Sequence, residues 1–147
     1  MDSFRVDIVS AEESLFSGDA AFVLAPLAEG EAGFLPGHSP LLGRLKAGAL
    51  HIHDTAGVEQ AFYVSGGFVE VQPDHVIVLA DSSQRAADID EARALKAVQD
   101  AEEAVRERLG KVDYARAESE LTEALARLRV ARTFRGRARG LPPNRIA

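Results

Sequence analysis

The apolar and polar positions of the first 81 residues follow a period of two, the pattern of β-strands that bury one face. At the start of the chain, Phe4, Val6 and Ile8 alternate with polar residues. Further runs of this kind occupy residues 21–25, 49–53, 60–65, 68–71 and 76–80. Many short strands with short connections predict a sandwich or barrel.

Two glycines interrupt the longest of these apolar stretches. Gly66 and Gly67 fall inside an otherwise β-branched and aromatic run from Phe62 to Val71. Glycine inside a strand marks a bulge or a close approach of backbones. We therefore expect a sharp bend here that lets one strand serve two sheets. Residues 82–85, which follow the last predicted strand, are interpreted as a linker.

From Asp88 onward the pattern changes to that of helices. Alanine, glutamate and arginine dominate, and no proline occurs before Pro142. Asp88 or Asp90 is the candidate N-cap of a helix that ends at Gly110, and Asp113 is the candidate N-cap of a second helix. The apolar stripes are Leu95, Val98, Ala101, Val105 and Leu109 in the first helix and Tyr114, Ala117, Leu121, Ala124, Leu128 and Ala131 in the second.

The short break between the helices predicts an antiparallel hairpin. The predicted fold is mainly β: an N-terminal sandwich or barrel at residues 1–87, a C-terminal antiparallel two-helix hairpin at 88–135 and a basic, disordered tail at 136–147. The seam of the hairpin is rich in alanine and buries little area, whereas a fully buried leucine contributes about 2 kcal/mol. Such a hairpin is marginal alone, which suits an element with two states.

Composition narrows the classes of function. With 147 residues and a net charge of −6, the chain is a folded protein that we do not expect to bind nucleic acid non-specifically. It contains no cysteine, which excludes disulfides and cysteine nucleophiles. We expect no export signal and no membrane span. The charge is uneven, because residues 1–87 carry 12 acids against 4 Lys and Arg, whereas Arg127 to Arg145 contain seven arginines and no acid.

Candidate chemistry in the first half is sparse. His51 and His53 would share one strand face, as a metal pair requires, but spacing identifies no third ligand. His38 lies in a loop flanked by prolines, without a neighbouring nucleophile motif, which favours a structural or interface role. Glu29 and Glu31 are a conceivable acid–base pair, but a polar contact surface fits a loop tip better. We expect no catalytic residue, no metal and no cofactor.

The arginine-rich end, from Arg132 to Gly140, admits three interpretations. Its composition resembles that of a tail for nucleic acid or another anionic surface, and it is also that of a frayed basic terminus. Contact with an acidic protein surface is the third. A small adaptor that binds an anionic partner through this end is therefore the alternative function. A small hydrolase that uses His38 or the histidine pair is a further rival.

Five stretches, in order, resemble the epsilon subunit family of bacterial F-type ATP synthases. They are residues 9–18 (VSAEESLFSG), 33–42 (GFLPGHSPLL), 64–71 (VSGGFVEV) with 78–81 (VLAD), 89–94 (IDEARA) and 112–117 (VDYARA). The resemblance extends to about Arg132. It implies a non-catalytic rotor subunit whose partners are the gamma subunit, the c ring and the alpha and beta subunits. It also implies a peripheral location at the cytoplasmic face of the bacterial inner membrane, reached only through the complex.

The resemblance assigns surfaces on the sandwich. Ser10, His38 and Gly43 look like parts of the gamma-facing surface. The turn from Glu29 to Gly33, with Glu31 foremost, looks like the loop that faces the c ring. A short polar loop suits an aqueous ring surface, and a proline-stiffened loop loses little entropy on docking.

In this family the helical hairpin folds against the sandwich or extends along the stalk, where it blocks rotation in the hydrolysis direction. Arg127, Arg129 and Arg132 are, by resemblance, the candidates to meet an acidic loop of the beta subunit in the extended state.

Some relatives bind ATP on the folded hairpin through an Ile-Asp-x-x-Arg-Ala motif. The motif is intact here and offers Asp90 and Arg93, and Arg127 matches a basic position on the second helix. However, Asp100 and Glu123 stand where the nucleotide-binding relatives have arginines. Because two carboxylates repel a polyphosphate, we expect weak ATP binding or none. The favoured role of Asp90 is that of a helix cap.

Overall fold

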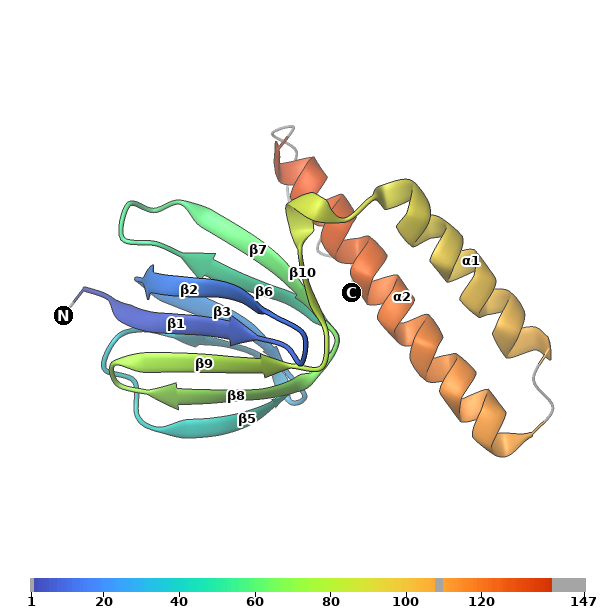
Figure 1. Ribbon diagram of the computed structural model, residues 1–147, viewed down its shortest axis with the longest axis horizontal. Helices are drawn as coiled ribbons and strands as arrows, with labels where there is room; N and C mark the ends of the chain where they lie inside the picture. Colours follow the sequence, from blue (N-terminus) through green and yellow to red (C-terminus); the bar gives the residue numbers. More distant parts are fainter. Residues whose placement is uncertain (1, 108–109, 139–147) are drawn as a thin grey trace. The chain divides into compact units, whose positions relative to one another are not determined.

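The computed structural model describes residues 2–107 and 110–138. The chain divides into two compact units, one that ends at Arg85 and one that begins at Ala86. Figure 1 shows that the first unit consists of strands and the second of two long helices.

The described part of the first unit contains ten strands. They are β1 (Phe4–Val9), β2 (Ser14–Ala20), β3 (Phe22–Leu27), β4 (Gly30–Phe34), β5 (Leu41–Leu45), β6 (Gly48–His53), β7 (Glu59–Val64), β8 (Gly67–Gln72), β9 (His75–Ala80) and β10 (Ser83–Arg85). Their hydrogen-bonded order is β10-β7-β6-β3-β5-β8-β9-β1-β2, and β4 pairs with β3. Of these pairs, only β1 with β9 is parallel. The predicted sandwich or barrel is confirmed.

The strands form two layers. One contains β4, β3, β6, β7 and β10, and the other contains β5, β8, β9, β1 and β2. The layers meet where β3 and β5 pair at Leu27 and Leu45. The far ends of the order, β10 and β2, also approach each other. There Arg85 donates from Nη2 to the carbonyl of Leu15 at 2.6 Å and from Nη1 to Oε1 of Gln60 at 3.1 Å, so the sandwich is nearly closed.

The core between the layers is made of the inward residues of the alternating strands. In β1 the buried residues are Phe4, Val6 and Ile8, as the period-two pattern predicts. Phe34, Phe62, Ile8, Leu50 and Ile52 are the largest fully buried side chains of this core.

Gly66 lies between β7 and β8, which belong to different layers, and Gly67 is the first residue of β8. Their φ angles are 144° and 109°, a region that side chains strongly disfavour. A Cβ atom at Gly67 would lie only 2.0 Å from the carbonyl oxygen of Leu79 in β9. The predicted sharp bend is therefore confirmed, but it separates two strands, β7 and β8, and does not lie within one strand that serves two sheets.

Four strands of the sandwich were not predicted, namely β2, β4, β5 and β10. The prediction of a linker at residues 82–85 is wrong, because Ser83–Arg85 form a strand that pairs with β7. The side chain of Arg85 stabilises this pairing through its hydrogen bond to Gln60. The expected turn from Glu29 to Gly33 is shorter than predicted, because Gly30–Phe34 form β4 and the turn contains only Ala28 and Glu29.

The second unit is a helical hairpin, as predicted. A short 3-10 turn, η1 (Ala86–Asp88), leads to α1 (Glu91–Glu107) and then α2 (Lys111–Ala138), and the two helices pack antiparallel (Figure 1). Val98, Ala117, Leu128 and Ala131 are buried, as predicted. The stripe of α1 needs one correction: Leu95 is exposed and Ala94 is buried, because the buried side of the helix follows the spacing 94, 98, 101 and 105. Leu109 lies outside the described residues.

The helix ends confirm one predicted cap and correct another. The Oδ1 atom of Asp90 accepts from the amide of Arg93 at 3.1 Å, so Asp90 is the N-cap of α1. In α2 the carbonyl of Gly110 accepts from the amide of Tyr114 at 2.8 Å. The N-cap is therefore Gly110 rather than Asp113, whose carboxylate instead lies in the first turn, where it favours the positive end of the helix dipole.

The end of α2 lies further along the chain than predicted. The helix runs to Ala138, so residues 136–138, expected to begin the disordered tail, are helical. Arg135 and Arg137 lie in its last turn, where positive side chains favour the carbonyl end of a helix. The remaining tail, residues 139–147, lies outside the described residues. None of the described helices is both long enough and apolar enough to span a bilayer.

Candidate docking surfaces

The outer side of the layer that contains β5, β8 and β9 carries large exposed apolar side chains. Leu42, Phe68 and Leu79 are 71%, 47% and 53% exposed, and we call these three residues the apolar patch. Strand pairing sets Phe68 opposite both Leu79 and Arg44. Because side chains alternate across a strand, these residues share one face, away from the core. The patch therefore crosses three adjacent strands.

Charged side chains border the patch. Arg44 lies over the ring of Phe68, with its guanidinium carbon 5.8 Å from the ring centre. Glu70 is exposed on the same face and pairs across the strands with Leu42 and Ile77. An apolar centre with a charged rim is the usual composition of a protein–protein interface. Exposed apolar groups of this kind mark sites of interaction.

The apolar patch was not predicted from the sequence, although one signal for it exists. Leu41 and Leu42 are consecutive in β5, and neighbours in a strand point to opposite sides. One of two consecutive leucines must therefore face outward.

A polar cluster occupies the same layer, on β1, β2 and β9. The hydroxyl of Ser17 donates to Oδ1 of Asp7 at 2.5 Å, and Nε2 of His75 donates to Oδ2 of Asp7 at 2.7 Å. Arg5 in turn donates to the Ser17 hydroxyl at 2.5 Å. The hydrogen bonds from Ser17 and then His75 lower the pKa of Asp7, against a smaller opposing effect of burial. Because the carboxylate stands between serine and histidine, this is not the order of a hydrolytic triad.

The three residues assigned to the gamma-facing surface occupy different parts of this layer. Ser10 follows β1, which ends beside Leu79, whereas His38 precedes β5, which begins beside the far end of β8. They therefore lie at opposite ends of the layer. Gly43 lies within β5, but a Cβ atom there would point inward, 3.2 Å from Leu27. The gamma-facing role of all three stays a prediction.

The loop that carries His38 is held from several sides. Its Nδ1 donates to the carbonyl of Ser39 at 2.6 Å, and its ring meets the edge of Phe34 at a centroid distance of 5.2 Å. The amide of Gly37 donates to the carbonyl of Pro73 at 2.8 Å, which ties this loop to the turn between β8 and β9. These contacts fit the predicted structural or interface role.

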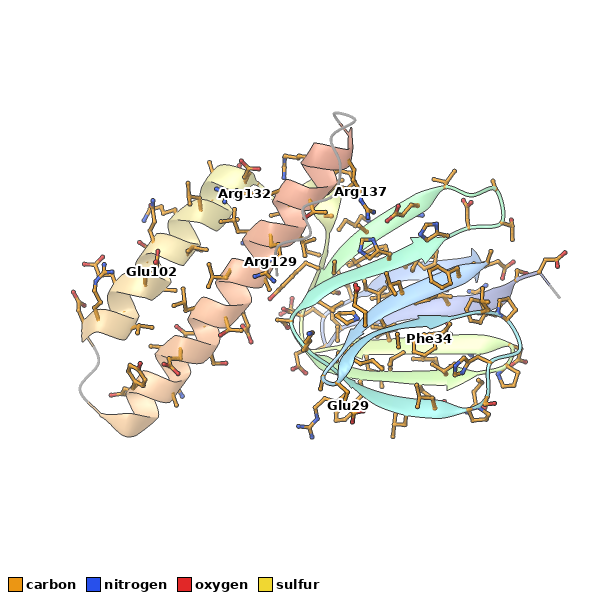
Figure 2. All side chains as sticks on the ribbon, turned by 180° about the vertical axis from the view of Figure 1, so that it is seen from behind. Glu29, Phe34, Glu102, Arg129, Arg132 and Arg137 are labelled. Carbon is orange, nitrogen blue, oxygen red and sulfur yellow. The ribbon has the colours of Figure 1, made fainter. Side chains whose placement is uncertain are left out.

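The residues assigned to the c-ring-facing surface lie on one hairpin of the other layer. Glu29 and Glu31 are exposed, and Figure 2 labels Glu29 in the turn between β3 and β4. Gly33 has a packing role, because a Cβ atom there would lie 2.7 Å from the ring of Phe22. The two glutamates form an acidic tip, and its contact with a c ring stays a prediction.

The histidine pair lies on β6 as predicted. Nδ1 of His51 donates to Oε1 of Glu59 at 2.7 Å. The ring of His53 packs edge-on against the ring of Phe22, with a distance of 5.6 Å between the ring centroids. Within residues 2–107 and 110–138, no group of three or more potential metal ligands is close enough to hold an ion.

The arginines of α2 do not form one surface. Leu125, Arg129 and Arg132 are exposed and follow the spacing i, i+4, i+7, so they share one side of the helix. Figure 2 labels Arg129 and Arg132 on α2. Arg127 is half-buried and lies about 200° around the helix from Arg129. Contact of these arginines with a beta subunit stays a prediction.

The surroundings of the nucleotide motif do not favour phosphate binding, because one motif residue caps a helix and a nearby residue is a carboxylate. Asp90 is engaged as the N-cap of α1, whereas the side chain of Arg93 is exposed. Asp100, on the same helix, pairs with Lys96 at 3.1 Å. Weak ATP binding or none stays our expectation.

The fold and these surfaces define a two-part protein: a β-sandwich with an exposed apolar face, joined to a helical hairpin. The family model for the beta-sandwich domain of the ATP synthase delta/epsilon chain matches residues 3–86. The model for the long alpha-helix domain of the same chain matches residues 87–132. The arginine-rich end beyond residue 132 lies outside both matches.

Curated relatives agree over nearly the whole length. The ATP synthase epsilon chain of Nitrosospira multiformis is 51% identical over 137 residues, which cover 93% of this chain and 99% of the relative. The ATP synthase epsilon chain of Nitrosococcus oceani is 54% identical over 133 residues, with coverage of 90% and 95%. The chain therefore belongs to the ATP synthase delta/epsilon chain family, as an epsilon-type subunit of an F-type ATP synthase.

Solved structures confirm the fold. A chain in the Euglena gracilis mitochondrial ATP synthase assembly of OSCP, F1 and c-ring has a TM-score of 0.77 at 20% identity, covering 86% of this chain and 79% of that chain. A chain in the Tetrahymena thermophila mitochondrial ATP synthase central stalk and c-ring has a TM-score of 0.63 at 16% identity, with coverage of 87% and 96%.

Proposed function

We propose that this chain is a non-catalytic central-stalk subunit that couples the gamma subunit to the c ring. In this proposal, the sandwich docks on gamma through the apolar patch, and the acidic tip of Glu29 and Glu31 faces the ring. The subunit is then peripheral at the cytoplasmic face of the bacterial inner membrane and is held there by the complex.

The observation that carries this proposal is the exposure of Leu42, Phe68 and Leu79 on one sheet face. Burying such side chains against a partner is favourable by about 25 cal/mol for each Å² of apolar area. Ser10 and His38 border the same layer at its two ends.

Binding to an epsilon-depleted catalytic core tests this docking. We expect Phe68→Glu to weaken binding at least tenfold, because a charge would replace an apolar contact at the centre of the patch. Val58→Glu is the matched control: Val58 is 57% exposed but lies on the connection between β6 and β7. Equal binding of both variants and the unchanged chain would contradict docking through the patch.

We further propose that the hairpin restrains ATP hydrolysis when it opens and extends. Its alanine-rich seam supports an element with a small free energy of opening. The exposed side formed by Leu125, Arg129 and Arg132 supports contact with an acidic surface such as that of a beta subunit.

Charge reversal tests the contact made by the open hairpin. Arg129→Glu combined with Arg132→Glu should weaken inhibition of hydrolysis several-fold and remove its sensitivity to salt, because screened charge pairs depend on ionic strength. Inhibition that keeps both its strength and its salt dependence would count against this contact. Binding of the sandwich to the core should not change.

A further inference from the structure

Arg135 joins the end of the second helix to the start of the first. It lies in the last turn of α2, and its Nη2 donates to the backbone carbonyl of Ile89, 46 residues earlier. Its Nη1 donates to the carbonyl of Ala131 within α2 at 3.4 Å. The guanidinium therefore spans from α2 to the segment that leads into α1.

The carbonyl of Ile89 is available because of the cap of α1. If the helix began earlier, the amide of Arg93 would donate to the carbonyl of Ile89, because a helical amide donates to the carbonyl four residues before it. That amide instead donates to Oδ1 of Asp90, the N-cap. Ile89 is fully buried, and a buried carbonyl without a donor costs free energy. Arg135 therefore supplies to the Ile89 carbonyl the hydrogen-bond donor that the amide of Arg93 does not provide.

The contact lies at the open end of the hairpin, opposite the turn between the helices. α2 has 28 residues and α1 has 17, and η1 contacts α2. The end of α2 thus closes over the residues that precede α1.

We propose that Arg135 is a latch that holds the open end of the hairpin closed, and that its release begins the separation of α2 from the start of α1. The latch consists of one hydrogen bond from Arg135 to the Ile89 carbonyl, made possible by the Asp90 cap. Its effect on hydrolysis rests on the proposed braking function, whereas its effect on the hairpin does not.

Hydrogen exchange of the full-length chain, read by mass spectrometry, tests the latch. Arg135→Gln should make exchange at residues 89–94 about fivefold faster, since a net hydrogen bond of ordinary strength is lost. Arg135→Lys, which keeps the charge but loses the planar fork, should fall between this variant and the unchanged chain. Exchange in β10 should not change, because Arg85 holds that strand within the sandwich.

Arg116→Gln is the matched control, since it removes the same charge from an exposed position near the start of α2. Unchanged exchange at residues 89–94 in Arg135→Gln, or an equal increase in Arg116→Gln, would overturn the latch. Fraying confined to the last turn of α2 would overturn it as well, because the latch predicts a change at α1.

Inhibition of ATP hydrolysis by an epsilon-depleted core distinguishes the latch at Arg135 from the proposed restraint of hydrolysis by the hairpin. If the hairpin restrains hydrolysis by opening, Arg135→Gln should inhibit about fivefold more strongly at equal occupancy. Faster exchange without stronger inhibition would support the latch and contradict the proposed brake. Unchanged exchange would refute the latch whatever the inhibition.

Discussion

The sandwich and the hairpin bury their apolar residues in different ways. The sandwich core contains large side chains such as Phe34, Phe62 and Ile52, contributed by strands that are distant in sequence. The hairpin buries mainly small residues such as Ala94 and Ala131. Because the free energy gained by burial scales with the apolar area that is buried, burial stabilises the closed hairpin far less than it stabilises the sandwich. In the proposed function, the fixed unit carries the docking face, and the unit that opens carries the exposed arginines.

The largest effect is expected where the two layers of the sandwich join. Gly67→Ala should destabilise the sandwich by about 4 kcal/mol or more, because its Cβ atom would lie 2.0 Å from the carbonyl oxygen of Leu79. Gly57→Ala is the control: its φ is also positive, at 82°, but nothing lies within 4 Å of the added atom. It should cost only about 1 kcal/mol. Urea unfolding measures both, and equal losses would contradict the close approach.

Two truncations of buried side chains test whether the sandwich and the hairpin unfold separately. Phe62→Ala should cost about 4 kcal/mol and lower the protection of the whole sandwich, because Phe62 is fully buried in its core. Leu128→Ala should cost about 3 kcal/mol but increase hydrogen exchange in the hairpin alone. If Leu128→Ala lowered protection of the sandwich core equally, the two units would open together and the comparison would fail.

The smallest expected effect depends on pH and belongs to the sandwich. The pKa of Asp7 is lowered in the folded state, so its contribution to stability is present above the unfolded pKa, about 4, and is lost as the pH falls through the folded pKa. Asp7→Asn should therefore cost about 1 kcal/mol at pH 7 and converge with the unchanged chain in strong acid. Urea unfolding at both pH values measures this. A difference that grows toward acid would have the wrong sign.

Strands with regular alternation and helices with long apolar stripes were predictable from the sequence. Other strands were not, because tertiary contacts stabilise them. The strand Ser83–Arg85 is too short to show a period, and the side chain of Arg85 fixes it to Gln60 and Leu15. The strand Gly30–Phe34 contains two glycines that resemble a turn, and the ring of Phe22 covers one of them.

The candidate surfaces were predictable to a smaller extent. Resemblance supplied Ser10, His38 and Gly43, but local pattern could not show that position 43 faces inward while Leu42 faces outward. The apolar patch depends on the pairing of β5, β8 and β9, and pairing is not encoded in any single strand. The bond from Arg135 to Ile89 likewise joins residues that are adjacent only after the hairpin has formed.

In the proposed function, the sandwich docks on the catalytic core while the hairpin restrains hydrolysis. We would therefore measure ATP hydrolysis by an epsilon-depleted core with either the full-length chain or a chain stopped after Ala87. Both forms should bind the core, and only the full-length chain should inhibit. Equal inhibition by the two forms would contradict the braking role of the hairpin. Failure of both to bind would contradict the docking of the sandwich.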